Sequence, residues 1–200
     1  MKKLILFLGL IYGSLNAQNN NTNPAVEPIE QSIFSFGVKG GFGHSFIMPY
    51  GNYKFNPSWN AGLSAVYAPW VHWGIGLDAT YSGEGVTLRE DDIDYVTQLD
   101  YVRVPLKGIY YFNRYENDFR PKINLGPTMG FLVNDHGNKG FSSFDLGATV
   151  GVGFNYRLLR AVWLNADVNY YQGLLDVYSA NTENDMNGNV RLDLGISVGF

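Results

Sequence analysis

The chain ends in the stretch VRLDLGISVGF, Val190–Phe200, in which apolar residues alternate with small or polar residues up to the last position. A period of two is typical of a β-strand with two different faces. Chain ends usually fray unless something holds them. Alternation that continues to a terminal aromatic residue therefore indicates a last strand that is paired along its whole length.

Seven earlier segments repeat this alternation and are separated by turn-rich connections. They span residues 33–46, 58–68, 73–85, 99–112, 121–133, 144–156 and 162–171. Segments of about ten alternating residues are typical of transmembrane β-barrels, which have short turns on one side and longer loops on the other. We therefore predict an all-β fold, an eight-stranded antiparallel up-and-down transmembrane β-barrel, with both termini on the short-turn side.

The connections fit this topology because their lengths alternate. The predicted short connections are residues 69–72, 113–120 and 157–161. The predicted long connections are residues 47–58, 86–98, 134–143 and 174–189.

Composition excludes several classes of function. The 200 residues include no Cys, so disulfides, cysteine metal sites, thiol nucleophiles and a lipid-modified Cys are excluded. The net charge of −4 leaves no basic footprint for a nucleic acid. Frequent Gly (24), Tyr (14) and Phe (13) favour strands and turns over helices.

The first residues read MKKLILFLGLIYGSLNAQ, with two lysines before a short apolar stretch and small residues after it. This pattern predicts a cleaved signal peptide, residues 1–17, rather than a buried helix, and the apolar stretch is too short for a membrane span. Residues 18–32 are rich in Asn and Pro and are predicted to form a flexible tail. Residues 33–200 then form the barrel.

The contents of the two strand faces decide which face meets lipid. The outside of a soluble barrel is normally rich in Lys and Glu, whereas the polar face here is mostly Gly, Ser, Thr and Asn. Small side chains suit a narrow lumen, so we place the apolar face in lipid; a secreted lipocalin-like barrel is the alternative. Aromatic residues near strand ends predict girdles at the two membrane interfaces: Trp59, Tyr67, Trp73, Tyr81, Tyr110, Phe112, Tyr156 and Tyr170.

Charged residues of both signs fall on the predicted inner face. Unpaired buried charges are costly, so a balanced set predicts a closed, salt-bridged lumen rather than an ion-selective pore. The set comprises Lys39, Asp78, Glu84, Arg103, Lys107, Lys122, Asp145, Asp167, Arg191 and Asp193. Pro105 and Pro127 lie inside strands and predict local ladder breaks or bulges, because proline lacks the N–H donor.

Several motifs together resemble the PorT-like outer-membrane β-barrel domain of Bacteroidetes. The most specific are YVRVPL at Tyr101–Leu106 and INLGPTMGFL at Ile123–Leu132; GVKGGFG, GLDATYSGEG, FDLGATVGVGF and LNADVNYYQGLLDV follow the same order. The resemblance covers nearly all of the mature chain. It implies a small barrel in the outer membrane of a Gram-negative bacterium and carries no catalytic motif. The name-giving member is linked to protein export through the type IX system.

Candidate chemistry is sparse. His44 and Ser45 resemble a base and a nucleophile, but adjacent strand residues point to opposite faces. His72 and His136 are predicted to be solvated loop residues. Acidic side chains of the outer loops could bind divalent cations, including those that bridge lipopolysaccharide, or simply be solvated: Glu90, Asp91, Asp92, Asp94, Asp135, Asp176, Glu183 and Asp185.

We therefore expect a non-enzymatic envelope protein without a cofactor or metal, whose partners are outer-membrane lipid and lipopolysaccharide and, during biogenesis, the barrel-assembly machinery. Phe200 resembles the terminal aromatic residue that this machinery recognises. The alternatives are an accessory subunit of an outer-membrane machine such as type IX secretion and, more remotely, a lipid A-modifying enzyme or a small channel.

Overall fold

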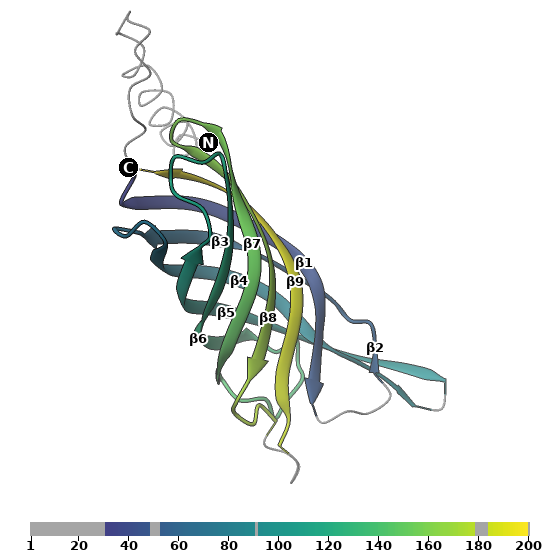
Figure 1. The fold of residues 1–200 in the computed structure, drawn as a ribbon. Coiled ribbons are helices and arrows are strands. Elements are labelled where there is room, and N and C mark those ends of the chain that lie inside the picture. Colours follow the sequence, from purple (N-terminus) through teal and green to yellow (C-terminus); the bar gives the residue numbers. More distant parts are fainter. Residues whose placement is uncertain (1–30, 49–52, 91, 179–183, 200) are drawn as a thin grey trace, which may run out of the picture.

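The computed structural model describes residues 31–48, 53–90, 92–178 and 184–199. In this part of the chain the strands form one antiparallel sheet that closes into a barrel (Figure 1). Eight strands make the wall, in the ring order β1–β3–β4–β5–β6–β7–β8–β9. Their bounds are β1 Phe34–Met48, β3 Pro57–Tyr67, β4 Trp73–Glu90, β5 Ile93–Tyr111, β6 Phe119–Asn134, β7 Phe144–Leu159, β8 Val162–Gly173 and β9 Met186–Gly199.

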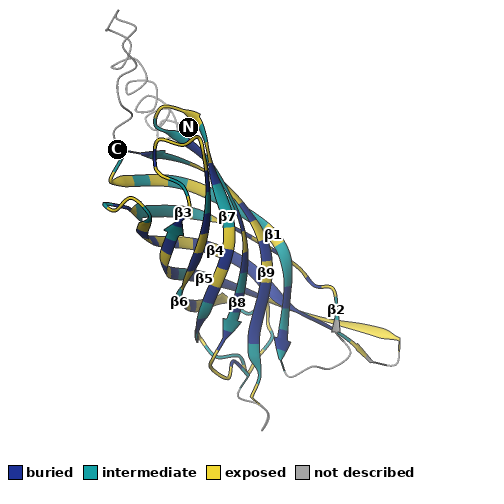
Figure 2. Ribbon diagram, in the orientation of Figure 1, coloured by how far each residue is buried: buried dark blue, intermediate teal, exposed yellow. Residues whose placement is uncertain are grey.

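The predicted eight-stranded antiparallel ring is confirmed. A further short strand, β2 (Tyr53–Lys54), pairs only with β4. Burial alternates along each wall strand, with polar residues enclosed and large apolar residues exposed (Figure 2). A closed ring leaves no unpaired strand edge in lipid, which is why a sheet can cross a membrane in this form. None of the described residues forms a helix long and apolar enough to cross a membrane.

Both ends of the described chain meet at one end of the barrel, here called the terminal end. Three connections lie there, at residues 68–72, 112–118 and 160–161. Two residues predicted to belong to the flexible tail are attached to this rim: Gln31 Nε2 donates to the Ala68 carbonyl at 2.6 Å, and Tyr115 Oη donates to Ser32 Oγ at 2.9 Å. These two residues are therefore held against the barrel, and the predicted signal peptide lies outside the described residues.

The closing seam joins β1 to β9 in a continuous register from Ser35↔Gly199 to Met48↔Met186. The last strand is thus paired along its length, as its alternation indicates. Phe200 itself lies outside the described residues.

Pro105 and Pro127, the two prolines predicted to disturb the ladder, interrupt it without shifting its register. The β4–β5 ladder lacks two pairs, at Pro105 and at the residue before it. The β5–β6 ladder lacks two pairs, at Pro127 and at the residue before it. The register is the same before and after each gap. The sequence left breaks and bulges as alternatives, and these are breaks. A missing N–H donor is sufficient to explain them.

The largest correction concerns the predicted long loop at residues 86–98. These residues extend β4 and β5 into a paired hairpin that turns only after Glu90 and reaches the far end of the molecule, here called the hairpin end. Asp92 has a φ of 62°, a left-handed conformation that Asp tolerates in tight turns. The acidic residues had indicated a loop, but charge does not prevent strand pairing where both faces can meet water.

Candidate functional site

The lumen is the candidate site, because it gathers the charged residues of the wall. The structure places all ten predicted lumen charges on the inner face. Nine are buried, and the side chain of Lys39 is 10% exposed. They lie in layers, described here from the hairpin end to the terminal end.

Arg103 occupies the first layer and is fully buried. Its Nε and Nη2 donate to the two oxygens of Glu84 at 3.1 and 2.6 Å. Its Nη1 donates to Asp145 Oδ2 at 2.6 Å. One guanidinium therefore joins carboxylates from β4 and β7, and its pair with Glu84 has the bidentate geometry that gives the strongest ion pairs.

Two tyrosine rings enclose this guanidinium. Arg103 Cζ lies 4.2 Å from the Tyr101 ring centroid and 4.4 Å from that of Tyr171. The Tyr171 hydroxyl donates to Asp145 Oδ2 at 2.8 Å, and Asn187 Nδ2 donates to the same oxygen at 2.9 Å. This cluster, the Arg103 layer, fills the lumen with side chains from β4, β5, β7, β8 and β9.

The middle layer is organised around Asp78. Lys107 and Lys39 both donate to Asp78 Oδ2, at 2.6 and 3.0 Å, and Ser64 Oγ donates to Oδ1 at 2.7 Å. Lys39 also lies 3.3 Å from Asp193 Oδ2. Each lysine is thus neutralised by a neighbouring carboxylate.

Amide side chains complete this layer. Asp193 accepts from Asn60 Nδ2 and Asn169 Nδ2, both at 2.7 Å, and Asn124 Nδ2 donates to Asn169 Oδ1 at 3.3 Å. Hydrogen-bonded side chains therefore cross the lumen from β3 to β6. Lys122 forms a separate ion pair, in which it donates to Asp167 at 3.0 Å. Arg191 lies 3.9 Å from Glu84, which is a weaker contact.

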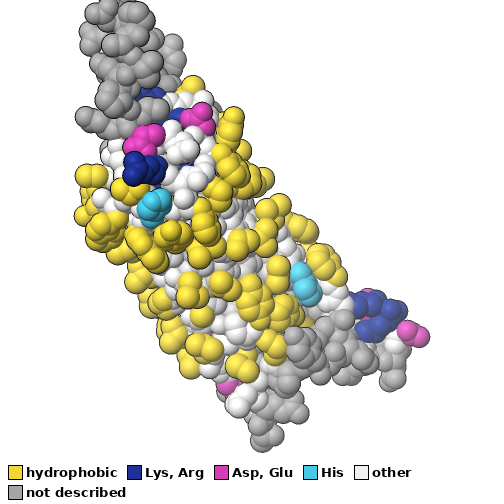
Figure 3. Space-filling model, viewed as in Figure 1, with side chains coloured by type: hydrophobic (Ala, Val, Ile, Leu, Met, Phe, Trp, Pro, Cys, Tyr) yellow, Lys and Arg dark blue, Asp and Glu magenta, His cyan; other side chains and the backbone are white. Residues whose placement is uncertain are grey.

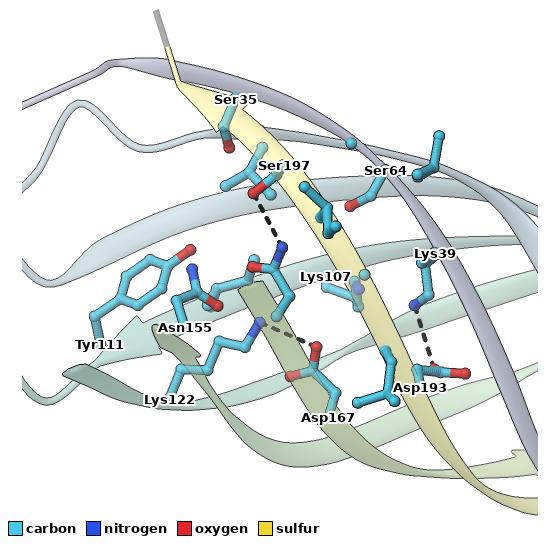
Figure 4. Close-up of a pocket in the computed structure, with 18 residues that line it drawn as sticks. Ser35, Lys39, Ser64, Lys107, Tyr111, Lys122, Asn155, Asp167, Asp193 and Ser197 are labelled. Atoms are coloured by element: carbon cyan, nitrogen blue, oxygen red, sulfur yellow. Dashed lines mark hydrogen bonds and ion pairs between the residues drawn. The ribbon is translucent and has the colours of Figure 1, made fainter. Parts of the chain in front are cut away.

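A cavity of about 50 Å³ lies between the middle layer and the terminal end (Figure 4). Lys39, Lys107, Lys122, Asp167 and Asn155 contribute to its lining. By this measure one water molecule needs about 10–15 Å³, so the space suits a few waters and no larger solute. The Asp167 and Asn155 side chains each have one buried oxygen without a protein donor, which such waters can satisfy.

A cation–aromatic cluster closes the terminal end. Arg120 is buried with its Cζ 4.0 Å from the Tyr111 ring centroid. Tyr115, from the 112–118 turn, packs against Trp163 with centroids 5.3 Å apart, and Arg157 lies 4.1 Å from the Trp163 centroid. The sequence prediction missed this cluster because it placed Arg120 in a turn. The signal that could have found it is the strand alternation: Arg120 and Lys122 are two residues apart and therefore share a face, if the strand is allowed to continue through the proline between them.

The eight predicted girdle residues all lie on the outer wall, in two groups. Tyr67, Trp73, Tyr110, Phe112 and Tyr156 lie towards the terminal end, and Trp59, Tyr81 and Tyr170 lie towards the hairpin end. Rings contact within each group: Trp73–Tyr110 centroids are 4.9 Å apart and Trp59–Tyr81 centroids are 5.7 Å apart. On the face in Figure 3, hydrophobic side chains cover the wall and charges gather at the ends, as expected for a wall in lipid.

A second polar cluster that the sequence prediction missed lies at the hairpin end of the wall. Asp100 is buried, and its Oδ2 accepts from the Tyr81 hydroxyl and His136 Nε2, both at 2.8 Å, and from Asn134 Nδ2 at 3.2 Å. His136 is an exposed loop residue, as predicted, but its bond to Asp100 was not foreseen. It has a φ of 50° and is followed by Gly137 at 84°, so its tight turn directs the ring at Asp100.

The remaining candidates do not assemble a reactive centre. Ser45 is buried inside the barrel, while the ring of His44 stacks on Phe55 with centroids 5.0 Å apart. Both instead bind Asn56: its N–H donates to His44 Nδ1 at 3.0 Å and its Nδ2 donates to Ser45 Oγ at 2.9 Å.

His72 Nδ1 is bonded to the Tyr111 carbonyl at 2.8 Å. Among the described residues, no group of three or more His, Cys, Asp or Glu side chains is arranged to hold a metal ion. Asp91, Glu183 and the side chain of Glu90 lie outside what the structure describes, so cation binding and simple solvation of the acidic outer loops both stay open.

Comparison with known proteins gives a consistent picture. A family model described as an outer membrane protein beta-barrel domain matches residues 16–179. No curated protein matches the chain in sequence. Among solved structures, the outer membrane protein OprG from Pseudomonas aeruginosa is 19% identical, with 86% of this chain and 98% of that chain covered and a TM-score of 0.55.

Two further structures are similar. Neisserial surface protein A is 19% identical, covering 84% of this chain and 98% of that chain, with a TM-score of 0.57. The outer membrane enzyme PagL is 14% identical, covering 80% and 97%, with a TM-score of 0.55. At these identities the likeness shows the shared barrel fold alone.

Proposed function

The chain belongs to the outer membrane protein beta-barrel domain family, and from that premise we propose that it is a non-enzymatic barrel with a closed lumen, which stabilises the envelope or presents its outer segments at the cell surface. Membership of this family places the barrel in the outer membrane of a Gram-negative bacterium. The termini then face the periplasm, because the export signal predicted at residues 1–17 and the short turns belong on that side.

The observation that carries the proposal is the Arg103 layer. Its guanidinium lies between the rings of Tyr101 and Tyr171 and is bonded to Glu84 and Asp145, all on strands of the wall. Moving it aside would leave two carboxylates buried without their cation, which is costly. A lumen closed by such a layer supports a structural role over conduction.

A planar-bilayer recording tests the closed lumen. We expect no conductance steps from the wild-type barrel at 100 mV. The triple variant Arg103→Ala, Tyr101→Ala, Tyr171→Ala removes the layer and, provided it folds, serves as the comparison for a widened lumen. Steady single-channel conductance from the wild type would contradict the proposal.

The absence of an enzymatic role has its own test. His44 and Ser45 are separated by the barrel wall and bonded to Asn56, an arrangement that supports a non-catalytic protein. Lipid A from a deletion strain should give the same mass spectrum as lipid A from the parent strain. A lost or gained acyl chain that the intact gene restores would favour the lipid-modifying alternative.

The second candidate is an accessory subunit of an outer-membrane machine. Its support is the resemblance to PorT-like barrels in the motifs YVRVPL and INLGPTMGFL, together with a hairpin that projects well beyond the wall. Co-purification from mild detergent should then recover a stoichiometric envelope protein, whereas a barrel that purifies alone favours the first candidate.

For biogenesis we propose that the barrel-assembly machinery recognises Phe200. Deletion of Phe200 should then slow insertion of the barrel into the membrane.

A further inference from the structure

The β4–β5 hairpin is far longer than the wall around it. The two strands stay in register from Trp73↔Tyr110 to Glu90↔Ile93, whereas β6 pairs with β5 only from Asp100 onward. Residues 93–99 therefore run past the last β6 partner for roughly 20 Å at about 3.3 Å per residue. Figure 1 shows this hairpin projecting beyond the barrel and β2.

One face of the hairpin carries charges that neutralise one another. Lys54 Nζ donates to Asp94 Oδ2 at 2.8 Å, and Arg89 Nε lies 3.7 Å from Asp94 Oδ1. The hydrogen bond from Lys54 holds the pKa of Asp94 below its ordinary value. These charges are exposed, which places this face in water rather than in lipid (Figure 3).

The opposite face exposes two neighbouring apolar side chains of β5, and the position of Glu90, which pairs with Ile93, belongs to the same face. Tyr95 pairs across the hairpin with Leu88, and Ile93 lies one alternation further on the same face. Ile93 is 56% exposed and Tyr95 is 54% exposed. Exposed apolar side chains on an element that stands in water indicate a binding surface.

The outer edge of β5 is also open. Among the described residues, no backbone hydrogen bond other than those to β4 reaches residues 93–97, and Asn138 Nδ2 donates to the Gln98 carbonyl at 3.1 Å where the open part ends. Proteins usually protect such an edge with Lys, Pro or a bulge. The segment IDYVT contains no Lys, Pro or bulge and is rich in strand-forming residues; its one charged side chain, Asp94, is bonded to Lys54.

We propose that residues 93–97 are a docking edge for an extended, basic segment of another polypeptide, which adds to the hairpin as a further strand. A strand is the element that can satisfy a row of backbone groups and place alternate apolar side chains against Ile93 and Tyr95. Charge supplies the preference for a basic partner, because the four acids of residues 89–94 outnumber the two cations beside them, Arg89 and Lys54. The inference rests on the proposed placement of the hairpin outside the membrane.

A peptide titration against the full-length barrel in lipid nanodiscs tests the docking edge. The probe is a fluorescent peptide, Lys-Thr-Val-Thr-Val-Thr-Val-Lys, measured by polarisation. We expect saturable binding that weakens at least tenfold when alternate peptide amides are N-methylated, because those amides make the strand hydrogen bonds. Replacing both lysines by Glu should also weaken binding.

Matched protein variants assign the binding to the hairpin. Ile93→Ser with Tyr95→Ser should weaken binding at least tenfold, whereas Val96→Ser, which removes a 65% exposed apolar side chain from the charged face, should change it less than threefold. No saturable binding, or binding that ignores N-methylation, would overturn the docking edge. Either result leaves the bilayer recording of the closed lumen unaffected, so the two proposals fail separately.

Discussion

Replacing Arg103 by Met should lower the stability of the barrel more than any other single change in the lumen. The side chain is fully buried, and its removal takes the cation from Glu84 and from Asp145, which lie 2.6 Å from its two terminal nitrogens. Breaking a buried ion pair by deleting one partner costs about 3–5 kcal/mol. Methionine fills part of the space but satisfies neither carboxylate, so we expect a loss in that range.

The assay is reversible urea unfolding of the barrel in lipid vesicles, followed by tryptophan fluorescence and by the heat-dependent gel shift of the folded form. Lys54→Met is the control, because the Lys54–Asp94 pair is exposed and exposed pairs contribute little to stability. The triple variant Arg103→Met, Glu84→Gln, Asp145→Asn should recover part of the loss, because it removes the stranded charges. A loss below about 1 kcal/mol for Arg103→Met would refute the view that this ion pair holds the lumen closed.

Three further outcomes are expected. Gly130→Ala should cost about 1–3 kcal/mol in the same urea assay, because its new methyl group would press on Arg103 Nη1, while Gly108→Ala, whose nearest neighbour is 3.7 Å away, should be tolerated. Lowering the pH from 7 to 3 should lower the protection factors of the amides at the hairpin tip, which are the exchange rates corrected for the intrinsic rate at each pH. The hydrogen bond from Lys54 depresses the pKa of Asp94, so their contact is stabilising above the unfolded carboxylate pKa and is lost as the pH falls through the folded one. Asp100→Asn should speed exchange in the neighbouring β6–β7 turn but not in β9, since Asp100 is the acceptor that holds that turn.

The ring and the sorting of its two faces followed from the sequence, because the period of two in the residues is also the period of the pleated strand. Lys39 and Asp78 could be assigned to one face before any pairing was known. Their contact could not, since it depends on the stagger between strands, which alternation does not encode. The same holds for Arg103, whose partners Glu84 and Asp145 come from β4 and β7.

The errors have physical causes as well. Residues 86–98 were predicted as a loop because of their acids, yet acids are compatible with a strand that stands in water. Arg120 was missed because Pro121 was taken as a strand start, whereas a proline tolerated in a strand lets the alternation continue on both sides. The bond between His136 and Asp100 depends on a left-handed backbone at His136, which no periodic pattern signals.

The seam between β1 and β9 also dictates when this protein can fold. It pairs the first strand made by the ribosome with the last, from Ser35↔Gly199 onward, so the ring has no closed intermediate of shorter length. Contacts between residues so far apart in the chain are slow to form. Until they form, the incomplete sheet exposes two unpaired strand edges that are prone to aggregation. Closure of the ring therefore waits for β9, and a chain truncated before VRLDLGISVG lacks the strand that pairs with this edge of β1.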